Sequence, residues 1–135
     1  AVEREREITM SWQSYVDDHL IGTGHVVQGA ICGVDGAIWA ASAGFNVSPE
    51  EVQKIVAGFE DPSGLQAGGI YLCGEKHMFI RSDDRFVAGK KDSNGIFAWK
   101  ANTCVVIGTH GENIQGNNCN TCVGNLADYL MNSGM

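Results

Sequence analysis

The stretch Met10-Ser-Trp-Gln-Ser-Tyr-Val-Asp-Asp-His-Leu-Ile21 predicts the helix around which the chain is organised. Ser11 is typical of a helix N-cap, because its hydroxyl can accept a hydrogen bond from an unpaired backbone N–H of the first turn. The side chains that follow recur every three or four residues, which is the spacing of one helical face. They are Trp12, Tyr15, Val16, His19 and Leu20.

Two aromatic residues with polar tips begin this face, where a core helix more often has Leu, Ile or Val. One interpretation is that Trp12 and Tyr15 are core residues, since large aromatic side chains bury much apolar surface. The other is that they form a partly open platform for a ligand. The helix alone leaves both interpretations open.

The composition is that of one folded domain. The chain has 135 residues, of which 44% are hydrophobic and 19% charged, and this balance is typical of a globular protein. Its apolar runs are too short for a transmembrane helix. Residues 1–9 alternate acid and base without a hydrophobic face, so we expect a solvated N-terminal extension, native or added, with the single domain spanning 10–135 and no secretory signal.

The net charge and the cysteine content narrow the choice of binding partners and of cellular compartment. The formal net charge is −7, which disfavours nucleic acid as a partner. Five cysteines are an odd number, and three of them lie in apolar, strand-like runs where a reduced cysteine behaves as a small hydrophobe. We therefore expect an intracellular, reduced protein.

The order of elements predicts the α+β class. After the first helix, Asp35-Gly36 separates two strands, and Ser48-Pro49-Glu50-Glu51 has the spacing of a capping box with proline at the first helical position. A meander of short strands and a final helix follow. The expected elements are strands at 26–34 and 37–42, a helix ending at 61–62, strands at 70–73, 76–81, 85–90, 96–100 and 104–109, and a helix from 118 or 120 to 132.

Cys119-Asn-Thr-Cys122 is the strongest local motif that suggests chemistry. Two thiols at a helix N-terminus can have lowered pKa values, or can supply two zinc ligands. The chain has no second such pair, however, and the motif follows a Gly/Asn-rich loop rather than a strand of a βαβ unit. Two reduced cysteines in one helical turn are the simpler interpretation. Since the sequence also has no nucleotide-binding glycine fingerprint and no nucleophile elbow, we expect no enzyme, cofactor or metal.

Most of the basic residues are concentrated in the meander. A positive face there would suit an acidic protein or an anionic lipid headgroup, although a solubilising strand face is an equally simple interpretation. The six residues are Lys76, Arg81, Arg85, Lys90, Lys91 and Lys100.

Four motifs in order along the chain resemble the profilins. They are the opening stretch, the hairpin Asp35-Gly-Ala-Ile-Trp-Ala40, the segment from Ser82-Asp-Asp-Arg85 to Gly89-Lys-Lys91, and the closing Leu126-Ala-Asp-Tyr-Leu-Met-Asn-Ser-Gly-Met135. The pattern is closest to lower-eukaryote and plant-type members. The resemblance implies a central antiparallel sheet of about seven strands, with the first and last helices side by side on one face and a further helix on the other.

The resemblance also implies partners: monomeric actin, proline-rich segments of assembly factors such as formins, and phosphoinositides. A polyproline II ligand is pre-ordered and its prolines lack N–H groups, so aromatic grooves with hydrogen-bond donors suit it. Met135 stands where many relatives end in an aromatic residue, which gives that edge a softer contact. By position, the polyproline site comprises Trp12, Tyr15, Trp39, Tyr129, Leu130 and Met135.

The family's actin face implies a second set, on the side opposite the polyproline site. It comprises Lys76, Met78, Arg81, Lys90, Lys91, Ile114, Gln115, Asn120, Thr121 and Asn125. For phosphoinositides, the positions are Arg81, Arg85, Lys90 and Lys91. Because Cys119 and Cys122 would lie beside the actin face, we expect their oxidation to weaken actin binding.

The expectation is thus a monomeric, cytoplasmic, cytoskeleton-associated binding protein that controls actin polymerisation. Two other classes of protein stay open. One is a thiol-redox protein that uses Cys119 and Cys122, and the other is a small-ligand sensor, because a sheet-plus-helix domain of this size can enclose a ligand.

Overall fold

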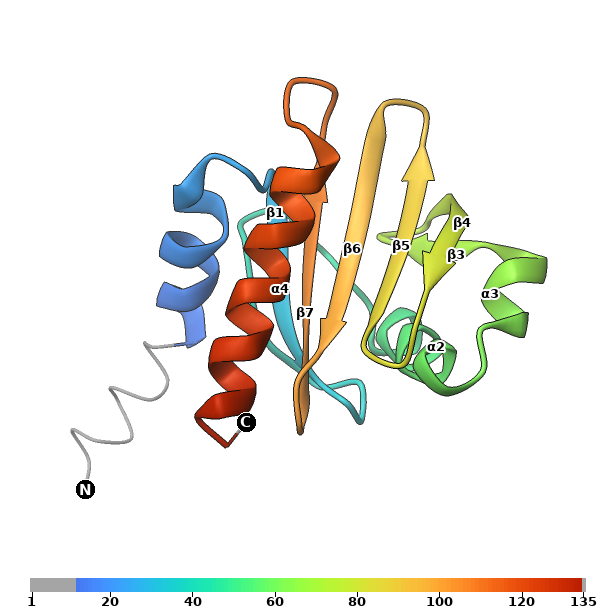
Figure 1. Cartoon of the computed structure of the whole chain (residues 1–135), viewed down its shortest axis with the longest axis horizontal. Helices are drawn as coiled ribbons and strands as arrows, with labels where there is room; N and C mark the ends of the chain where they lie inside the picture. The colour runs from blue at the N-terminus through green and yellow to red at the C-terminus, as the bar shows by residue number, and fades with distance from the viewer. Residues whose placement is uncertain (1–11, 135) are drawn as a thin grey trace.

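The protein, described by a computed structural model over residues 12–134, is one antiparallel sheet covered by helices on both faces (Figure 1). Residues 12–19 form the N-terminal helix. The other elements are η1 (Ile21–Thr23), β1 (Gln28–Gly33), β2 (Ile38–Ala41), α2 (Pro49–Glu60), α3 (Ser63–Gly68), β3 (Ile70–Leu72), β4 (Glu75–Ser82), β5 (Phe86–Lys91), β6 (Asn94–Lys100), β7 (Cys104–His110) and α4 (Gly116–Asn132).

The seven strands are ordered β2-β1-β7-β6-β5-β4-β3, and every neighbouring pair is antiparallel. The meander β3–β7 therefore follows chain order, while the first hairpin joins it through β1 and β7, which pair from Gln28↔Thr109 to Gly33↔Cys104. This arrangement confirms the predicted α+β class and the sheet of about seven strands.

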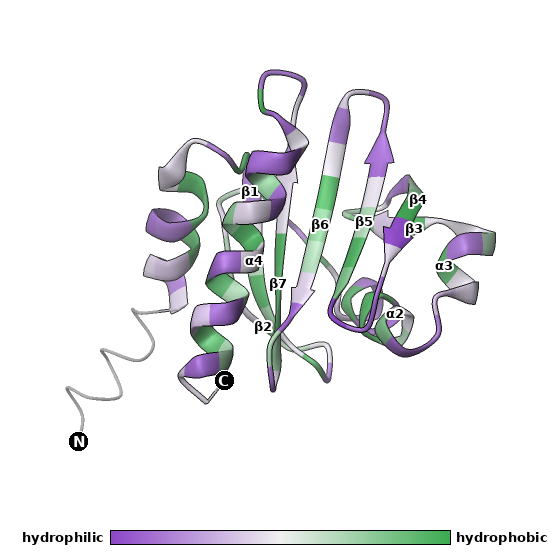
Figure 2. Cartoon of the chain, in the orientation of Figure 1, coloured by the Kyte–Doolittle hydropathy of each residue, from purple (hydrophilic) through white to green (hydrophobic). Residues whose placement is uncertain are grey.

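Strand alternation divides the interior into two cores, one on each face of the sheet. Ile31 and Val106 point to the face covered by the N-terminal helix and α4, whereas Ala30 and Ile107 point to the face covered by α2 and α3. Figure 2 shows the consequence in hydropathy, since the central strands are largely hydrophobic and the connecting loops largely hydrophilic. The first and last helices thus share one face, as expected.

Close packing holds α4 against β7. A Cβ atom at Gly108 would collide with the side chain of Val123, so only glycine lets the helix approach the strand this closely. The helix begins at Gly116, earlier than the asparagine start predicted from sequence, because the N–H groups of Asn118 and Cys119 both donate to the Gln115 carbonyl, at 3.0 and 3.2 Å.

The capping box of α2 is confirmed. The Glu51 N–H donates to Ser48 Oγ at 3.3 Å, and the Ser48 N–H donates to Glu51 Oε1 at 3.1 Å. The short helix α3 was not predicted, however, because Asp61-Pro62 is a signal for the end of a helix and not for the start of another. Pro62 occupies the N-cap position of α3, and Leu65 is buried against α2.

The Glu51 side chain also accepts hydrogen bonds from a turn that is distant in sequence. The β3–β4 hairpin turns at Cys73-Gly74, both with positive φ, so the turn begins within the strand that was predicted at 70–73. The N–H groups of these two residues donate to the Glu51 carboxylate at 2.9 and 2.8 Å. Desolvation by burial opposes ionisation of this carboxylate, but the hydrogen bonds from Gly74, Ser48 and Cys73 together lower the pKa of Glu51.

Glu51→Gln is expected to lower the free energy of unfolding at pH 7 by roughly 1–2 kcal/mol, because one acceptor oxygen and the charge are both lost. A depressed pKa contributes stability that is present above the ordinary pKa of glutamate and is lost as the pH falls through the folded value. The difference between the two proteins should therefore shrink below about pH 4.5. Urea unfolding at several pH values measures it.

Glu50→Gln is the matched control, since Glu50 lies in the same helical turn and is exposed. Its stability should differ from that of the wild-type chain by no more than about 0.5 kcal/mol. Equal losses of stability in the two variants would show that the charge in the first turn of α2 stabilises the fold, rather than the hydrogen bonds that Glu51 accepts from the β3–β4 turn.

Candidate functional site: an aromatic groove between the terminal helices

Four aromatic side chains from three elements form one contiguous cluster on the surface. Trp12 of the N-terminal helix lies 4.8 Å from Trp39 of β2 and 6.0 Å from Tyr15, between ring centroids. Tyr15 in turn contacts Tyr129 of α4, at 5.8 Å in an edge-to-face arrangement. Residues that are 117 positions apart in sequence thus line one strip, because the two terminal helices lie side by side on the sheet (Figure 1).

The cluster is partly open. Trp12, Tyr15 and Trp39 are half-buried and pack on the core below, while Tyr129 is 54% exposed. A hydrogen bond with Tyr129, and then desolvation, raise the pKa of Tyr15, so its hydroxyl keeps its proton. The two indole N–H groups, and the phenol O–H that is not used between Tyr15 and Tyr129, are donors that suit the carbonyls of a proline-rich chain.

Two residues of the predicted polyproline site are not among these four aromatic side chains. Leu130 is only 1% exposed and belongs to the core beneath the cluster, because its helical position turns it toward the sheet, and its contact with a ligand stays a prediction. Met135 lies outside the described residues.

The strip continues into a groove of about 600 Å³ between the N-terminal helix and α4. The end of the N-terminal helix is tied to α4 across it, because Cys122 Sγ donates to the His19 carbonyl at 3.3 Å and lies 3.4 Å from Thr23 Oγ1. The residues that line the groove are Tyr15, His19, Thr23, His25, Asn118, Thr121, Cys122, Asn125, Leu126 and Tyr129.

A second hollow, of about 580 Å³, lies over β4–β6 beside the first turns of α4. Arg81, Lys90 and Asn120 of the predicted actin set line it. Met78 is the cross-strand partner of Lys90 and is 68% exposed on the same face. The hollow and the aromatic cluster lie on the same face of the sheet. The actin set was predicted on the side opposite the polyproline site, but the two surfaces are separated only by α4 and lie on its two flanks.

A β-bulge assembles this surface. The register shifts between Phe79 and Arg81, so two successive residues, Ile80 and Arg81, both face the hollow. Ile80 is 50% exposed, and sequence reasoning missed it, because regular alternation offers no signal for a bulge.

The remaining members of the predicted actin set are spread over several surfaces. Lys91 points to the other face of the sheet, where its Nζ is 3.7 Å from a Glu75 carboxylate oxygen. Thr121 and Asn125 line the groove between the helices. Alternation places Lys76 with Met78, Gln115 is the exposed N-cap of α4, and Ile114 packs on the core beneath that helix.

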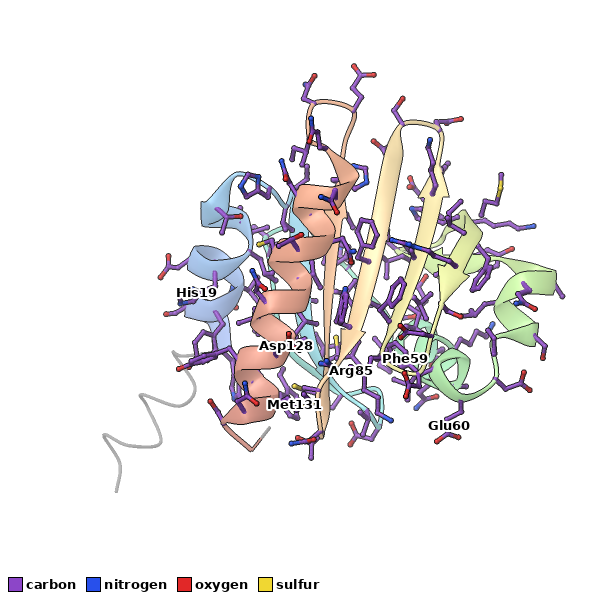
Figure 3. The ribbon with its side chains drawn as sticks, viewed as in Figure 1. His19, Phe59, Glu60, Arg85, Asp128 and Met131 are labelled. Atoms are coloured by element: carbon purple, nitrogen blue, oxygen red, sulfur yellow. The ribbon has the colours of Figure 1, made fainter. Side chains whose placement is uncertain are left out.

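Arg85 is engaged within the fold, as Figure 3 shows by its position near Asp128 of α4. Its Nη1 is 2.8 Å from Asp128 Oδ1, its other guanidinium nitrogens donate to the Lys100 carbonyl, and it lies over the Trp99 ring. Of the four phosphoinositide positions, the structure therefore brings only Arg81 and Lys90 together.

The cysteine pair does not have the environment of a reactive dithiol. Cys119 is fully buried, and burial raises its pKa to about 12, contrary to the lowering that its motif suggested. Cys122 faces the groove rather than the hollow over the sheet. The expectation that oxidation of this pair weakens actin binding thus loses its geometric basis.

Alkylation of the native protein at pH 8 should modify Cys73 and Cys122 and spare the other three cysteines. Burial raises the pKa values of Cys32 and Cys119 to about 12 and that of Cys104 to about 11, and all three side chains are closed to reagent. Peptide mapping by mass spectrometry measures the sites, with the denatured chain as the control for complete labelling. Early modification of Cys119 would contradict the packing of α4.

Within residues 12–134, no helix is both long and apolar enough to cross a membrane. The same residues hold no group of three or more His, Cys, Asp or Glu side chains arranged to bind a metal ion.

The fold is that of an α+β domain with an aromatic groove between its terminal helices. The profilin family model matches residues 10–135, and the chain belongs to the profilin family. Profilin-A of Physarum polycephalum is 45% identical over 125 residues, covering 93% of this chain and 99% of the relative. The crystal structure of Acanthamoeba castellanii profilin II matches with a TM-score of 0.90 at 44% identity, covering 92% and 99% of the two chains.

A further solved structure contains a ligand. Mouse profilin IIa, in complex with a double repeat from the FH1 domain of mDia1, matches with a TM-score of 0.78 at 28% identity, covering 92% of this chain and 99% of that one.

Proposed function

We propose that this profilin binds proline-rich segments of actin-assembly factors, formins among them, in the polyproline II conformation. The contiguous strip of Trp39, Trp12, Tyr15 and Tyr129 is the observation that carries the proposal. The mouse relative bound to an FH1 repeat supports it, since that repeat comes from a domain of the same kind of partner.

The chemistry of the strip matches that of the ligand. Proline has no backbone N–H, so a polyproline II chain offers carbonyl acceptors and flat ring faces, and little entropy is lost on binding because the chain is already extended. The strip offers aromatic faces and N–H and O–H donors. Titration with an all-proline peptide, followed by tryptophan fluorescence, tests the proposal, and a folded sample that shows no saturable change would refute it.

We propose in addition that the hollow over β4–β6 is the contact surface for monomeric actin. Exposed apolar side chains, Met78 and Ile80, lie beside the cations Arg81 and Lys90 there, although the chain as a whole is acidic. Local positive charge steers an acidic partner and fits rim ion pairs, while the apolar centre supplies burial. Sedimentation of a mixture with monomeric actin tests for a one-to-one complex.

With both surfaces on a single domain over residues 10–135, the protein regulates actin polymerisation by binding and not by catalysis. We infer that it acts as a monomer in the cytoplasm with the cytoskeleton, where the free state of its five cysteines is the normal one. Phosphoinositide binding stays a prediction, resting on Arg81 and Lys90.

A further inference from the structure

The groove between the N-terminal helix and α4 changes in chemistry along its length. In the aromatic strip that leads into it, the polar groups are indole N–H and phenol O–H groups. Beyond Tyr15 and Tyr129 the walls carry side-chain amides and hydroxyls and the imidazoles of His19 and His25, with Cys122 and Leu126 as an apolar floor. None of the lining side chains belongs to Asp, Glu, Lys or Arg.

Three polar side chains of α4 in this part of the groove are available to a ligand. Asn118, Thr121 and Asn125 are exposed, and within residues 12–134 their side chains make no hydrogen bond. By contrast, Thr23 Oγ1 donates to the Leu20 carbonyl at 2.6 Å and braces the wall. The helical spacing of the three free side chains places them along one line facing the N-terminal helix.

The groove is long enough to hold several residues of an extended peptide beyond the prolines that occupy the aromatic strip. Asn118 and Tyr129 are separated by about 16 Å of helix axis. A polyproline II chain rises about 3.1 Å per residue, so about five residues span this distance.

The hydrogen-bonding groups that line the groove indicate which kinds of peptide residue fill this distance. Proline offers only acceptors, which the indole and phenol donors match. A residue other than proline adds a backbone N–H, and a buried N–H without an acceptor costs about 1–3 kcal/mol. The amide side chains of Asn118 and Asn125 accept as well as donate. Their part of the groove therefore offers acceptors that the indole N–H groups of the strip do not, and it suits residues with a free backbone N–H.

We propose that the amide-lined part of the groove binds uncharged, non-proline residues. These residues flank the proline run of the peptide whose prolines occupy the aromatic strip. The inference rests on the proposed function, because the aromatic strip holds the prolines and continues directly into this part through Tyr15 and Tyr129. The flank makes hydrogen bonds to α4, while a charged flank would find no Asp, Glu, Lys or Arg side chain in the groove lining to pair with.

Four synthetic peptides test this inference. One contains prolines only, a second and a third carry two glutamines before or after the prolines, and a fourth carries two leucines at the better of those ends. A glutamine flank should tighten binding about 3- to 10-fold over the prolines alone, the equivalent of one or two net hydrogen bonds. The leucine flank should gain less.

Asn118→Ala combined with Asn125→Ala should remove the gain from glutamine while leaving the affinity for prolines alone unchanged. Asn113→Ala is the matched control, since Asn113 is an exposed amide in the loop before α4, away from the groove. Equal affinities for the four peptides, an equal gain from leucine, or a gain that survives the double substitution would overturn the inference. Failure of the proline-only peptide to bind would instead refute the proposed function.

Discussion

Trp39→Ala is expected to weaken the binding of an all-proline peptide by roughly 30-fold or more. Truncating a central aromatic anchor of an interface costs about 2 kcal/mol or more. Trp39 lies 4.8 Å from Trp12 and belongs to β2 rather than to either terminal helix, so its loss removes the sheet side of the strip and the support of its neighbour. Isothermal calorimetry measures the change in affinity directly.

A second variant guards against a trivial loss of fold, because Trp39 also packs on the core beneath the terminal helices. Tyr129 is largely exposed, so Tyr129→Ala should keep the stability of the wild-type chain and still weaken binding of the peptide. Unchanged affinity in this variant would contradict the placement of the site.

Trp99→Phe is the matched control for the fluorescence signal. Trp99 is the one tryptophan outside the strip; it stacks on Phe86 and its Nε1–H donates to Asn120 Oδ1 at 2.8 Å. The variant should retain both the peptide affinity and the fluorescence change on binding. A signal that disappears with Trp99 would place the ligand on the other flank of α4.

Lys90→Glu is expected to weaken actin binding about 10-fold at low ionic strength, mainly through a slower association rate. Lys90 lines the hollow over β4–β6, and its cross-strand neighbour there is the exposed Met78. Reversal of its charge places a carboxylate against an acidic partner. The loss should diminish as salt is added, because exposed charges are screened. Stopped-flow mixing with labelled monomeric actin measures the rate.

Lys91→Glu separates local geometry from net charge. It changes the charge of the chain by the same amount one residue later, but its side chain lies on the other face of the sheet, beside Glu75. Actin binding of this variant should stay within about twofold of the wild type. Equal losses in the two variants would mean that overall charge, and not the hollow, governs the encounter.

The contrast between Lys90 and Lys91 shows the limit of reading a strand from its sequence. Both are cations at the end of β5, although the predicted strand stopped at Lys90, and both were assigned to the actin and phosphoinositide sets. Strand alternation requires them to face opposite ways. Which of the two faces α4 depends on the register of β5 with its neighbours, and a run of residues alone does not reveal that register.

Other differences have the same origin. The bulge in β4 turns Arg81 to the side of Met78 and brings out Ile80. The rotation of α4 on the sheet, set where Gly108 admits Val123, buries Leu130 and turns Thr121 and Asn125 toward the N-terminal helix. The helical period of the sequence predicts a stripe but not the neighbour that covers each edge of it.

Local signals in the sequence predicted most of the helices and strands, whereas the kind of site was implied only by the resemblance to the profilins. The capping box at Ser48, the aromatic residues at Trp12 and Tyr15, and the alternating strands each depend on chemistry within a few residues, and so they could be predicted. Only the tertiary structure decided which residues share a surface. That result depends on strand register, on one bulge and on the close approach of α4 to β7, which are contacts between segments distant in the chain.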